Sequence, residues 1–315
     1  MARQCGFKIE ATEGTSVLGA AVPVTPFGFM GRGFPIPFAS RDASLTFQAN
    51  TRGQKGVTLG AAKVEASYDF DYGNAAPWLL TLGDVVHGDG VSTITLSDPD
   101  DLPSFSIYSE TNGKAYATTG CKVEQLVMKI VAGEPVACEM DVMGWNTVAT
   151  DLLNGTEGVV TWPASADTTV KGWSQINAGG WTFGSDDQGD VYEMIITAAN
   201  MMDAAHGMLS PIATGIDVLE TGAYMASFRG NFRGSADDLM AAFLAETEDD
   251  FVVKFDLPTA GNYHQITLKD MIINAPAVVA ESEKVTSFRL TGWASGDCIE
   301  VKIKDGCDYS SLLPT

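Results

Sequence analysis

Residues 126–145 read LVMKIVAGEPVACEMDVMGW, and residues 273–293 read INAPAVVAESEKVTSFRLTGW. Both stretches alternate hydrophobic and polar residues, turn once, alternate again, and end in Gly and Trp. Alternation with a period of two residues is typical of a half-buried β-strand. Each stretch therefore predicts an antiparallel hairpin with one face toward a core.

The two hairpins belong to a longer internal similarity. Residues 115–145 align without a gap on residues 263–293, and KVEASYDF at 63–70 resembles AYMASFRGN at 223–231. A period of about 150 residues predicts a duplicated domain, because solenoids and propellers repeat every 20–50 residues. A duplicated domain can place two copies of one interface on one chain, which suits a ring or another symmetric assembly.

We expect a mainly β fold with one helix in each domain, and we divide the chain into four segments. These are an arm with loops over residues 1–55, a first domain over 56–148, a linker over 149–175, and a second domain with a C-terminal tail over 176–315. Short turns between neighbouring strands favour antiparallel sheets. The architecture expected is a sandwich or barrel-like pair of sheets packed by the helix.

The helices are expected after the strand 56–71 in the first domain and after the strand 223–232 in the second. Asn74 is a candidate N-cap with Pro77 in the first turn, so a helix should run over residues 75–86 and stop at Gly88. Ser235 should cap a second helix over residues 236–247. The remaining expected strands are 56–71, 92–96, 104–109, 115–132, 135–143, 191–198, 223–232, 251–257, 263–280, 283–293 and 299–303.

The N-terminal arm contains an unusual run, VPVTPFGFMGRGFPIPFAS, at residues 22–40. Its prolines exclude a helix, and its aromatic content is unlike that of a disordered segment. Exposed apolar loops of this kind usually dock onto another surface. We expect inter-subunit contacts at Phe27, Phe29, Phe34 and Phe38, although the arm could also fold back on its own domain.

Composition argues against several classes of function. The net charge is −21 and the pI is about 4.3, so a surface that grips nucleic acid is not expected, because DNA binding needs Lys and Arg. No signal peptide or run of about 20 apolar residues is visible, which predicts a protein of a reducing interior without a membrane. The five cysteines form no C-x-x-C pair, and a bridge between Cys298 and Cys307 is only weakly indicated.

No catalytic, cofactor-binding or metal-binding pattern emerges from the residues. His87, His206 and His264 are far apart and are expected to be solvated or lightly packed. The acidic run at residues 98–101 lacks the residue pattern of a calcium loop, so a solvated turn is expected. Trp145 and Trp293 hold matching positions in the two repeats, which indicates packing. The sequence therefore predicts a protein that is not an enzyme.

The order of strand, helix and strands, followed by the hairpin at residues 126–145, resembles the tail tube proteins of long-tailed viruses of bacteria and archaea. The turn Gly133-Glu134-Pro135 and the return strand ending in Gly carry this resemblance, and residues 273–293 match more loosely. The resemblance implies two orthogonally packed antiparallel sheets with a flanking helix. Single-domain members form hexameric rings, so a chain with two such domains would form trimeric rings of pseudo-sixfold symmetry.

The resemblance also implies partners and a location. Stacked rings would form a hollow tube in the virion tail, assembled in the host cytoplasm beside tape measure, terminator and baseplate proteins. DNA would cross the lumen only as passing cargo, and an acidic lumen would repel its phosphates. Alternatives are a tail terminator or distal tail protein, a carbohydrate-binding β-sandwich module, and a hydrolase, which would need a pocket of titratable groups.

Overall fold

In the computed structural model the chain is mainly β, as the sequence predicts, and every strand pairing among the described residues is antiparallel. The structure describes residues 4–15, 18, 24–28, 34–36, 40–47, 54–98, 101–111, 114–131, 134–150, 181–184, 186–187, 190–200, 202–205, 218–220, 225–233, 241, 243–257, 259–273, 277–281, 285–293 and 298–314. Below, the first half denotes residues 4–150 and the second half denotes residues 181–314.

Twenty strands and one α-helix are described. Those of the first half are β1 (Gln4–Ile9), β2 (Ser40–Phe47), β3 (Gln54–Asp71), α1 (Ala76–Leu82), β4 (Gly83–Gly88), β5 (Val91–Leu96), β6 (Phe105–Thr111), β7 (Lys114–Val131), β8 (Ala137–Gly144) and β9 (Asn146–Thr150). Those of the second half are β10 (Trp181–Phe183), β11 (Asp186–Asp187), β12 (Asp190–Ala199), β13 (Asp203–Ala205), β14 (Val218–Glu220), β15 (Met225–Arg233), β16 (Glu248–Asp256), β17 (Tyr263–Ile273), β18 (Ala277–Glu281), β19 (Val285–Trp293), β20 (Ile299–Lys304) and the 3-10 helix η2 (Tyr309–Leu312).

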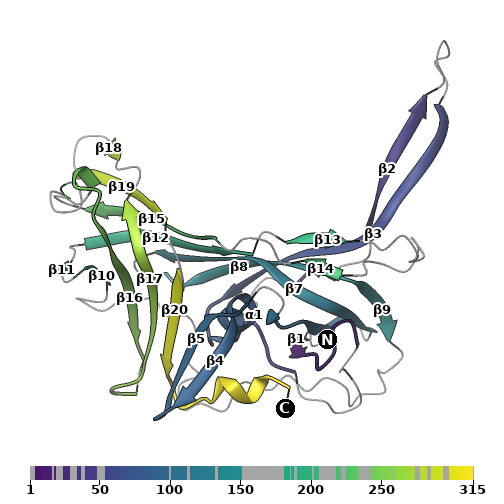
Figure 1. Cartoon of the computed structure of the whole chain (residues 1–315), viewed down its shortest axis with the longest axis horizontal. Helices are drawn as coiled ribbons and strands as arrows, with labels where there is room; N and C mark the ends of the chain where they lie inside the picture. Colours follow the sequence, from purple (N-terminus) through teal and green to yellow (C-terminus); the bar gives the residue numbers. More distant parts are fainter. Residues whose placement is uncertain are drawn as a thin grey trace.

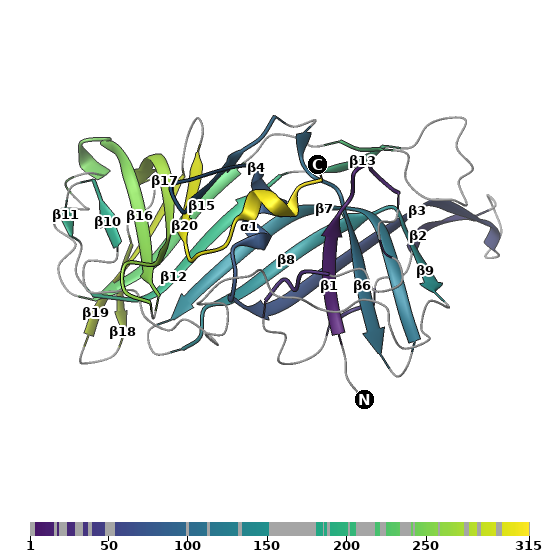
Figure 2. The ribbon, with the colours of Figure 1, turned by 90° about the horizontal axis from the view of Figure 1, so that it is seen from below.

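The halves lie side by side along the longest axis of the molecule, and the hairpin of β2 and β3 projects away from the body (Figure 1). Strands β3, β8, β7, β12, β15, β19 and β18 form one sheet that crosses both halves, here called the long sheet. Strands β4, β5, β20, β17, β16, β10 and β11 form a second, here called the cross sheet. Seen from below, β20, η2 and α1 lie over the long sheet (Figure 2).

One order of strand pairing occurs twice along the chain. In the first half β1 pairs with β6, β6 with β7, β7 with β9 and β8, and β8 with β3. In the second half β10 pairs with β16, β16 with β17, β17 with β20, β18 with β19, and β19 with β15. The hairpin predicted over residues 126–145 is the pair β7–β8.

Each half bends one of its long strands at a β-bulge. In β7 the bulge lies between Thr118 and Cys121 and contains Gly120 at φ 63°, where the strand leaves β6 to join β8. In β17 the bulge lies between Leu268 and Met271 and contains Asp270 at φ 47°. An extra residue with positive φ turns a strand sharply, so one strand can serve two sheets.

Helix α1 is shorter than the predicted span 75–86. Gly83 adopts φ 96° and donates its N–H to the carbonyl of Leu79, which ends the helix. The next residues form β4, in which Val86 is 66% exposed. The helix starts one residue later than predicted, and its N-cap is Ala75 rather than Asn74, whose Oδ1 instead accepts from the N–H of Ala76 at 2.8 Å. His87 therefore lies in β4 and does not end a helix.

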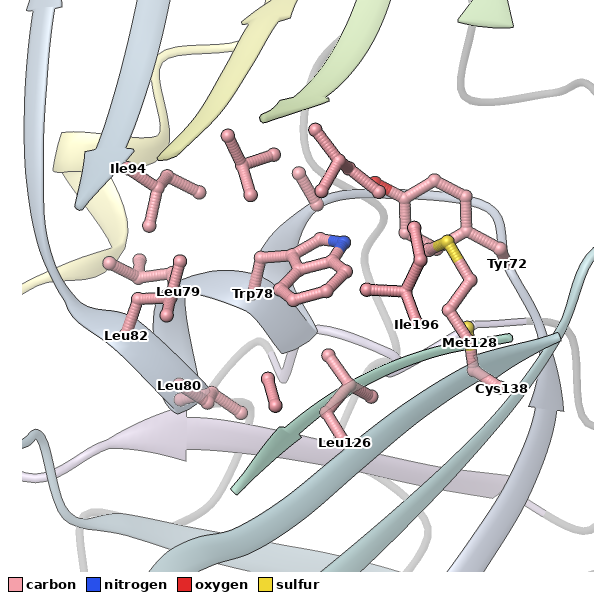
Figure 3. Close-up of a cluster of buried hydrophobic side chains, with 14 of the residues drawn as sticks. Tyr72, Trp78, Leu79, Leu80, Leu82, Ile94, Leu126, Met128, Cys138 and Ile196 are labelled. Atoms are coloured by element: carbon pink, nitrogen blue, oxygen red, sulfur yellow. The ribbon is translucent and has the colours of Figure 1, made fainter. Parts of the chain in front are cut away.

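All seven residues of α1 are buried in a core that draws on both halves. Trp78 lies among side chains that include Leu126 and Met128 of the first half and Ile196 of β12 in the second half (Figure 3). Replacing a fully buried Trp by Ala typically costs about 3–5 kcal/mol. This core therefore ties the two halves into one cooperative structure.

Several other predictions differ from the structure in the bounds of strands or in the state of single residues. The expected strand 263–280 is divided into β17 and β18, and β1 and β2 occur where only an arm with loops was expected. Strand β9 extends from the expected first domain into residues 149–150 of the expected linker, while residues 151–180, Ser235 and His206 lie outside the described residues. All five cysteines are free and buried, so Cys298 and Cys307 form no bridge.

Candidate functional site

The junction between the two halves is built first by the long sheet. Residues 125–131 of β7 pair continuously with residues 193–199 of β12. On one face of this seam, Lys129 Nζ lies 3.2 Å from Glu193 Oε1. Both side chains are partly exposed, so the ion pair contributes at most about 1 kcal/mol, and the backbone ladder provides the continuity.

The cross sheet makes the same junction a second time. Strand β20 pairs with β17 of its own half on one side and with β5 of the first half on the other. The hairpin β4–β5 thus lies on the second half although it begins directly after α1. Two independent ladders leave the halves little freedom to rotate about the seam.

A chain of buried polar groups crosses the junction beneath these ladders. Asp305 Oδ2 lies 3.2 Å from Nε2 of His264 and accepts from the hydroxyl of Tyr309 at 2.9 Å. Nδ1 of His264 lies 3.0 Å from the hydroxyl of Tyr72, which belongs to the first half. His264 and Asp305 are only 1% and 3% exposed, so the prediction of a solvated or lightly packed His264 is wrong.

The direction of the hydrogen bond between His264 and Asp305 follows from its acceptor. A carboxylate only accepts, so Nε2 of His264 donates to Asp305, whereas the direction of the hydrogen bond between Nδ1 and the Tyr72 hydroxyl depends on the protonation of the ring. Burial alone would raise the pKa of Asp305. The hydrogen bond and charge of His264, with the N–H of Cys307 and the hydroxyl of Tyr309, outweigh burial and hold the pKa of Asp305 below its usual value.

The second half also caps both ends of α1. The N–H of Ala75 donates to the hydroxyl of Tyr309 at 3.1 Å. At the other end, Asn200 Nδ2 donates to the carbonyl of Thr81 at 3.0 Å and to that of Val123 at 2.8 Å. Helix ends leave backbone groups without intrahelical partners, and here residues from the second half satisfy them.

This polar chain resembles a proton relay in its order of groups, yet it has no route to a substrate. Tyr72, His264, Asp305 and Tyr309 are all buried. Burial raises the pKa of Tyr72 and of Tyr309 well above the usual value, so both hydroxyls stay protonated. The arrangement can orient the two halves, and it offers no nucleophile at a surface.

The long sheet has two edges at which pairing stops. Beyond residue 63, β3 pairs with β8 on one side, and no described strand pairs with its other side. At the opposite end, β18 pairs with β19 on one side, again with no described strand on the other. Open edges expose a row of N–H and C=O groups that can pair with another chain.

One face of the long sheet is rich in carboxylates within the first half. Glu65, Asp69 and Glu139 are exposed, while Val64, Tyr68 and Met140 on the opposite face are buried. Asp69 lies directly opposite Glu139 in the ladder, and Ser67 lies opposite Asp141. Like charges directly opposite each other destabilise a sheet, so the pair Asp69–Glu139 lowers the stability of the fold. Folding stability therefore does not explain why these carboxylates face each other.

The predicted contact residues have different surroundings. Phe27 is 0% exposed and stacks on Phe7 at a ring-centroid distance of 5.1 Å, so within the chain the arm folds back on its own half at this point. Phe34 is partly buried against the same core. Phe29 and Phe38 lie outside the described residues.

The sequence did not identify the junction residues Tyr72, His264, Asp305 and Tyr309. Tyr72 and His264 are 192 positions apart in the chain, and no spacing motif links them. The described residues contain no cluster of three or more side chains suited to a metal ion. No helix within the described residues is long and apolar enough to cross a membrane.

Comparison with known proteins gives one result. A family model described as "Phage tail tube protein" matches residues 4–292, which cover the first half and most of the second. No curated protein matches the chain.

Proposed function

The chain belongs to the phage tail tube protein family, and from this premise we propose that three copies form a ring of pseudo-sixfold symmetry, with rings stacking into a hollow tube. It is a structural component of a virus tail. One observation carries the proposal about the ring: the junction between β7 and β12 joins two similar units, and among the described strands the long sheet then ends in two unpaired edges.

The proposal takes the two halves as duplicated tube units. It is supported by the order of strand pairing, which recurs with a bulge at Gly120 and at Asp270. In the repeat, β7 corresponds to β17 with β18, and β3 corresponds to β15. The unpaired edge of β18 in one subunit would therefore face the side of β3 in the next subunit with which no described strand pairs. This contact would take the place that the pairing of β7 with β12 holds within the chain. Three such contacts close the long sheet and remove its open edges.

The carboxylate-rich face of the long sheet would line the tube. Glu65, Asp69, Glu139 and Asp141 would be repeated around the wall, where they repel the phosphates of a passing genome. The opposed pair Asp69–Glu139 costs folding stability, and the gain would be a wall to which DNA does not adhere. DNA is then cargo and not a ligand.

Stacking would use the segments that leave the body. The hairpin of β2 and β3 projects from the molecule, and we propose that it reaches an adjacent ring (Figure 1). Phe29, Phe34 and Phe38 remain proposed inter-subunit contacts of the arm, whereas Phe27 is occupied by the chain's own core. The tape measure, terminator and baseplate proteins are the further partners proposed, with assembly in the host cytoplasm.

The test is the assembled form of the purified full chain. Native mass spectrometry should give trimers, and negative-stain images at high concentration should show tubes of even diameter with a central channel. Rings of six chains would overturn the trimer, because each chain carries two units. A single closed ring that never stacks would favour the tail terminator, and monomers at every concentration would overturn assembly altogether.

A further inference from the structure

The helices at corresponding positions of the two halves differ in burial. Helix α1 follows β3 and is buried over all seven residues. In the second half, helical residues 241 and 243–244 follow β15 and precede β16; they are here called the second helical turn. Its Phe243 packs against the core, while Leu244 is 75% exposed.

The cause of the difference lies in what covers α1. Tyr309 and Asn200, both from the second half, hydrogen-bond to the two ends of α1. Strand β20 then pairs with β5, the strand that follows α1 and β4. Helix α1 is therefore covered jointly by β4, β5 and β7 of its own half and by the half that comes after it.

The second helical turn lies in the later of the two described halves. The second helical turn is followed by β16 from Glu248, so no hairpin like β4–β5 separates them. Ile272, which pairs with Glu248 in the adjacent strand, is 36% exposed. Leu244 and Ile272 thus give this end of the molecule two exposed apolar side chains.

We propose that the first half of a second copy of this chain covers the second helical turn, with Leu244 at the contact. The occupant follows from the order of the halves: the second half covers α1, so in a ring the next first half takes the corresponding place on the second helical turn. This contact would lie outside the long sheet, and the inference rests on the proposed ring.

The contact between the two halves of one chain should then be stronger than the contact between two chains. Within the chain, the junction has the β5–β20 ladder and the chain from Tyr72 to Asp305. The second half has no counterpart of β4–β5 between the second helical turn and β16, so the contact between chains lacks that ladder. A ring should therefore come apart between chains, at Leu244, before its halves separate.

The first measurement is protection from labelling. Leu244→Cys should react with a maleimide in the dissociated chain and be protected at least tenfold in assembled rings, with Val86→Cys on β4 as the matched exposed control. The native cysteines are all buried, and burial raises the pKa of Cys5 and of Cys307 to about 12, which keeps their background low. Equal labelling of Leu244→Cys in both states would overturn the inference.

The second measurement is assembly. Leu244→Asp should raise the protein concentration needed for rings at least tenfold with unchanged monomer unfolding, while Val86→Asp should assemble as the wild type does. Wild-type assembly of Leu244→Asp, or an equal loss in Val86→Asp, would overturn the contact. Failure of the wild type to form rings would instead defeat the proposed function, so the two failures are distinguishable.

Discussion

His264 Nε2 lies 3.2 Å from Asp305 Oδ2 inside the junction of the two halves, and neither side chain is more than 3% exposed. Through Tyr72 on one side and Tyr309 on the other, this pair connects β3 and α1 of the first half to β17 and η2 of the second. The relative placement of the halves therefore depends on a few directional hydrogen bonds as well as on apolar packing.

Asp305→Asn should destabilise the chain by about 2–3 kcal/mol, because an amide cannot accept all the hydrogen bonds that the buried carboxylate accepts. Urea unfolding followed by tryptophan fluorescence measures the change. The matched control is Asp308→Asn, three residues away and largely exposed, which should leave the midpoint unchanged. Equal midpoints for Asp305→Asn and the wild type would contradict an anchoring role for this carboxylate.

The contribution of Asp305 should disappear in acid. Its pKa is lower in the folded chain than the ordinary value of 3.8, so its stabilisation is present above that value and is lost as the pH falls through the lower folded pKa. The stability difference between wild type and Asp305→Asn should be full at pH 6 and should shrink below about pH 4. Urea midpoints at a series of pH values measure this, and a difference that grows in acid would contradict the assignment.

Gly120→Ala should cost more than a positive φ alone explains. A Cβ at Gly120 would lie 2.5 Å from the ring of Trp145, whereas one at Gly90, also at positive φ, would meet nothing within 4 Å. Gly90→Ala should cost about 1–2 kcal/mol, and Gly120→Ala about 2–3 kcal/mol more.

A double mutant separates the two causes. In a Trp145→Ala background the additional cost of Gly120→Ala should vanish, because the obstructing ring is gone. Thermal and urea unfolding of the four variants measure the coupling. A cost that persists without Trp145 would assign the requirement for glycine to the backbone alone.

Glu10→Ala should destabilise the first half by about 3 kcal/mol, since it removes a buried acceptor from four donors. These donors are the N–H groups of Gly14 and Gly120 and the hydroxyls of Ser104 and Ser106. Glu139→Ala, at an exposed site, is the control for loss of a carboxylate. Urea midpoints measure both variants, and equal effects would refute a special role for Glu10.

Reversing charge on the proposed tube wall should make assembled tubes retain DNA. Tubes carrying Asp69→Lys with Glu139→Lys should bind duplex DNA at low salt and release it as the salt rises, because phosphate contacts are screened and counterions compete. The control carries Asp84→Lys with Asp89→Lys, which changes the net charge equally on β4 and its turn. Retention by both variants would show that net charge alone decides, and would remove the argument for an acidic wall.

Local patterns predicted the strands best. The alternation in residues 126–145 gave β7 and β8 nearly to the residue, because one face of each strand is buried and the other is polar. Asn74 and Pro77 placed the start of α1 to within one residue, although the N-cap is Ala75. Its end at Gly83 was missed, because the apolar residues Val85 and Val86 fit a helical spacing as well as a strand.

Long-range contacts explain what the sequence could not predict. β1 pairs with β6 about a hundred residues later, and β20 pairs with β5 across the two halves. No local sequence pattern predicts either pairing. His264 looked solvated because its partners, Tyr72 and Asp305, are distant in the chain. The exposure of Leu244 depends on what covers the second helical turn, which the pattern of its own helix does not determine.

The hydrogen bond from Ala75 to Tyr309 spans 234 positions, which bears on the order in which the molecule folds. Loops of this length close slowly, so α1 must wait with its apolar face incompletely covered until residues beyond 300 are synthesised and return to it. During that interval the first half is the part most exposed to premature association. Competence to assemble would thereby be coupled to completion of the second half, and each chain would reach the proposed ring with its internal seam already closed.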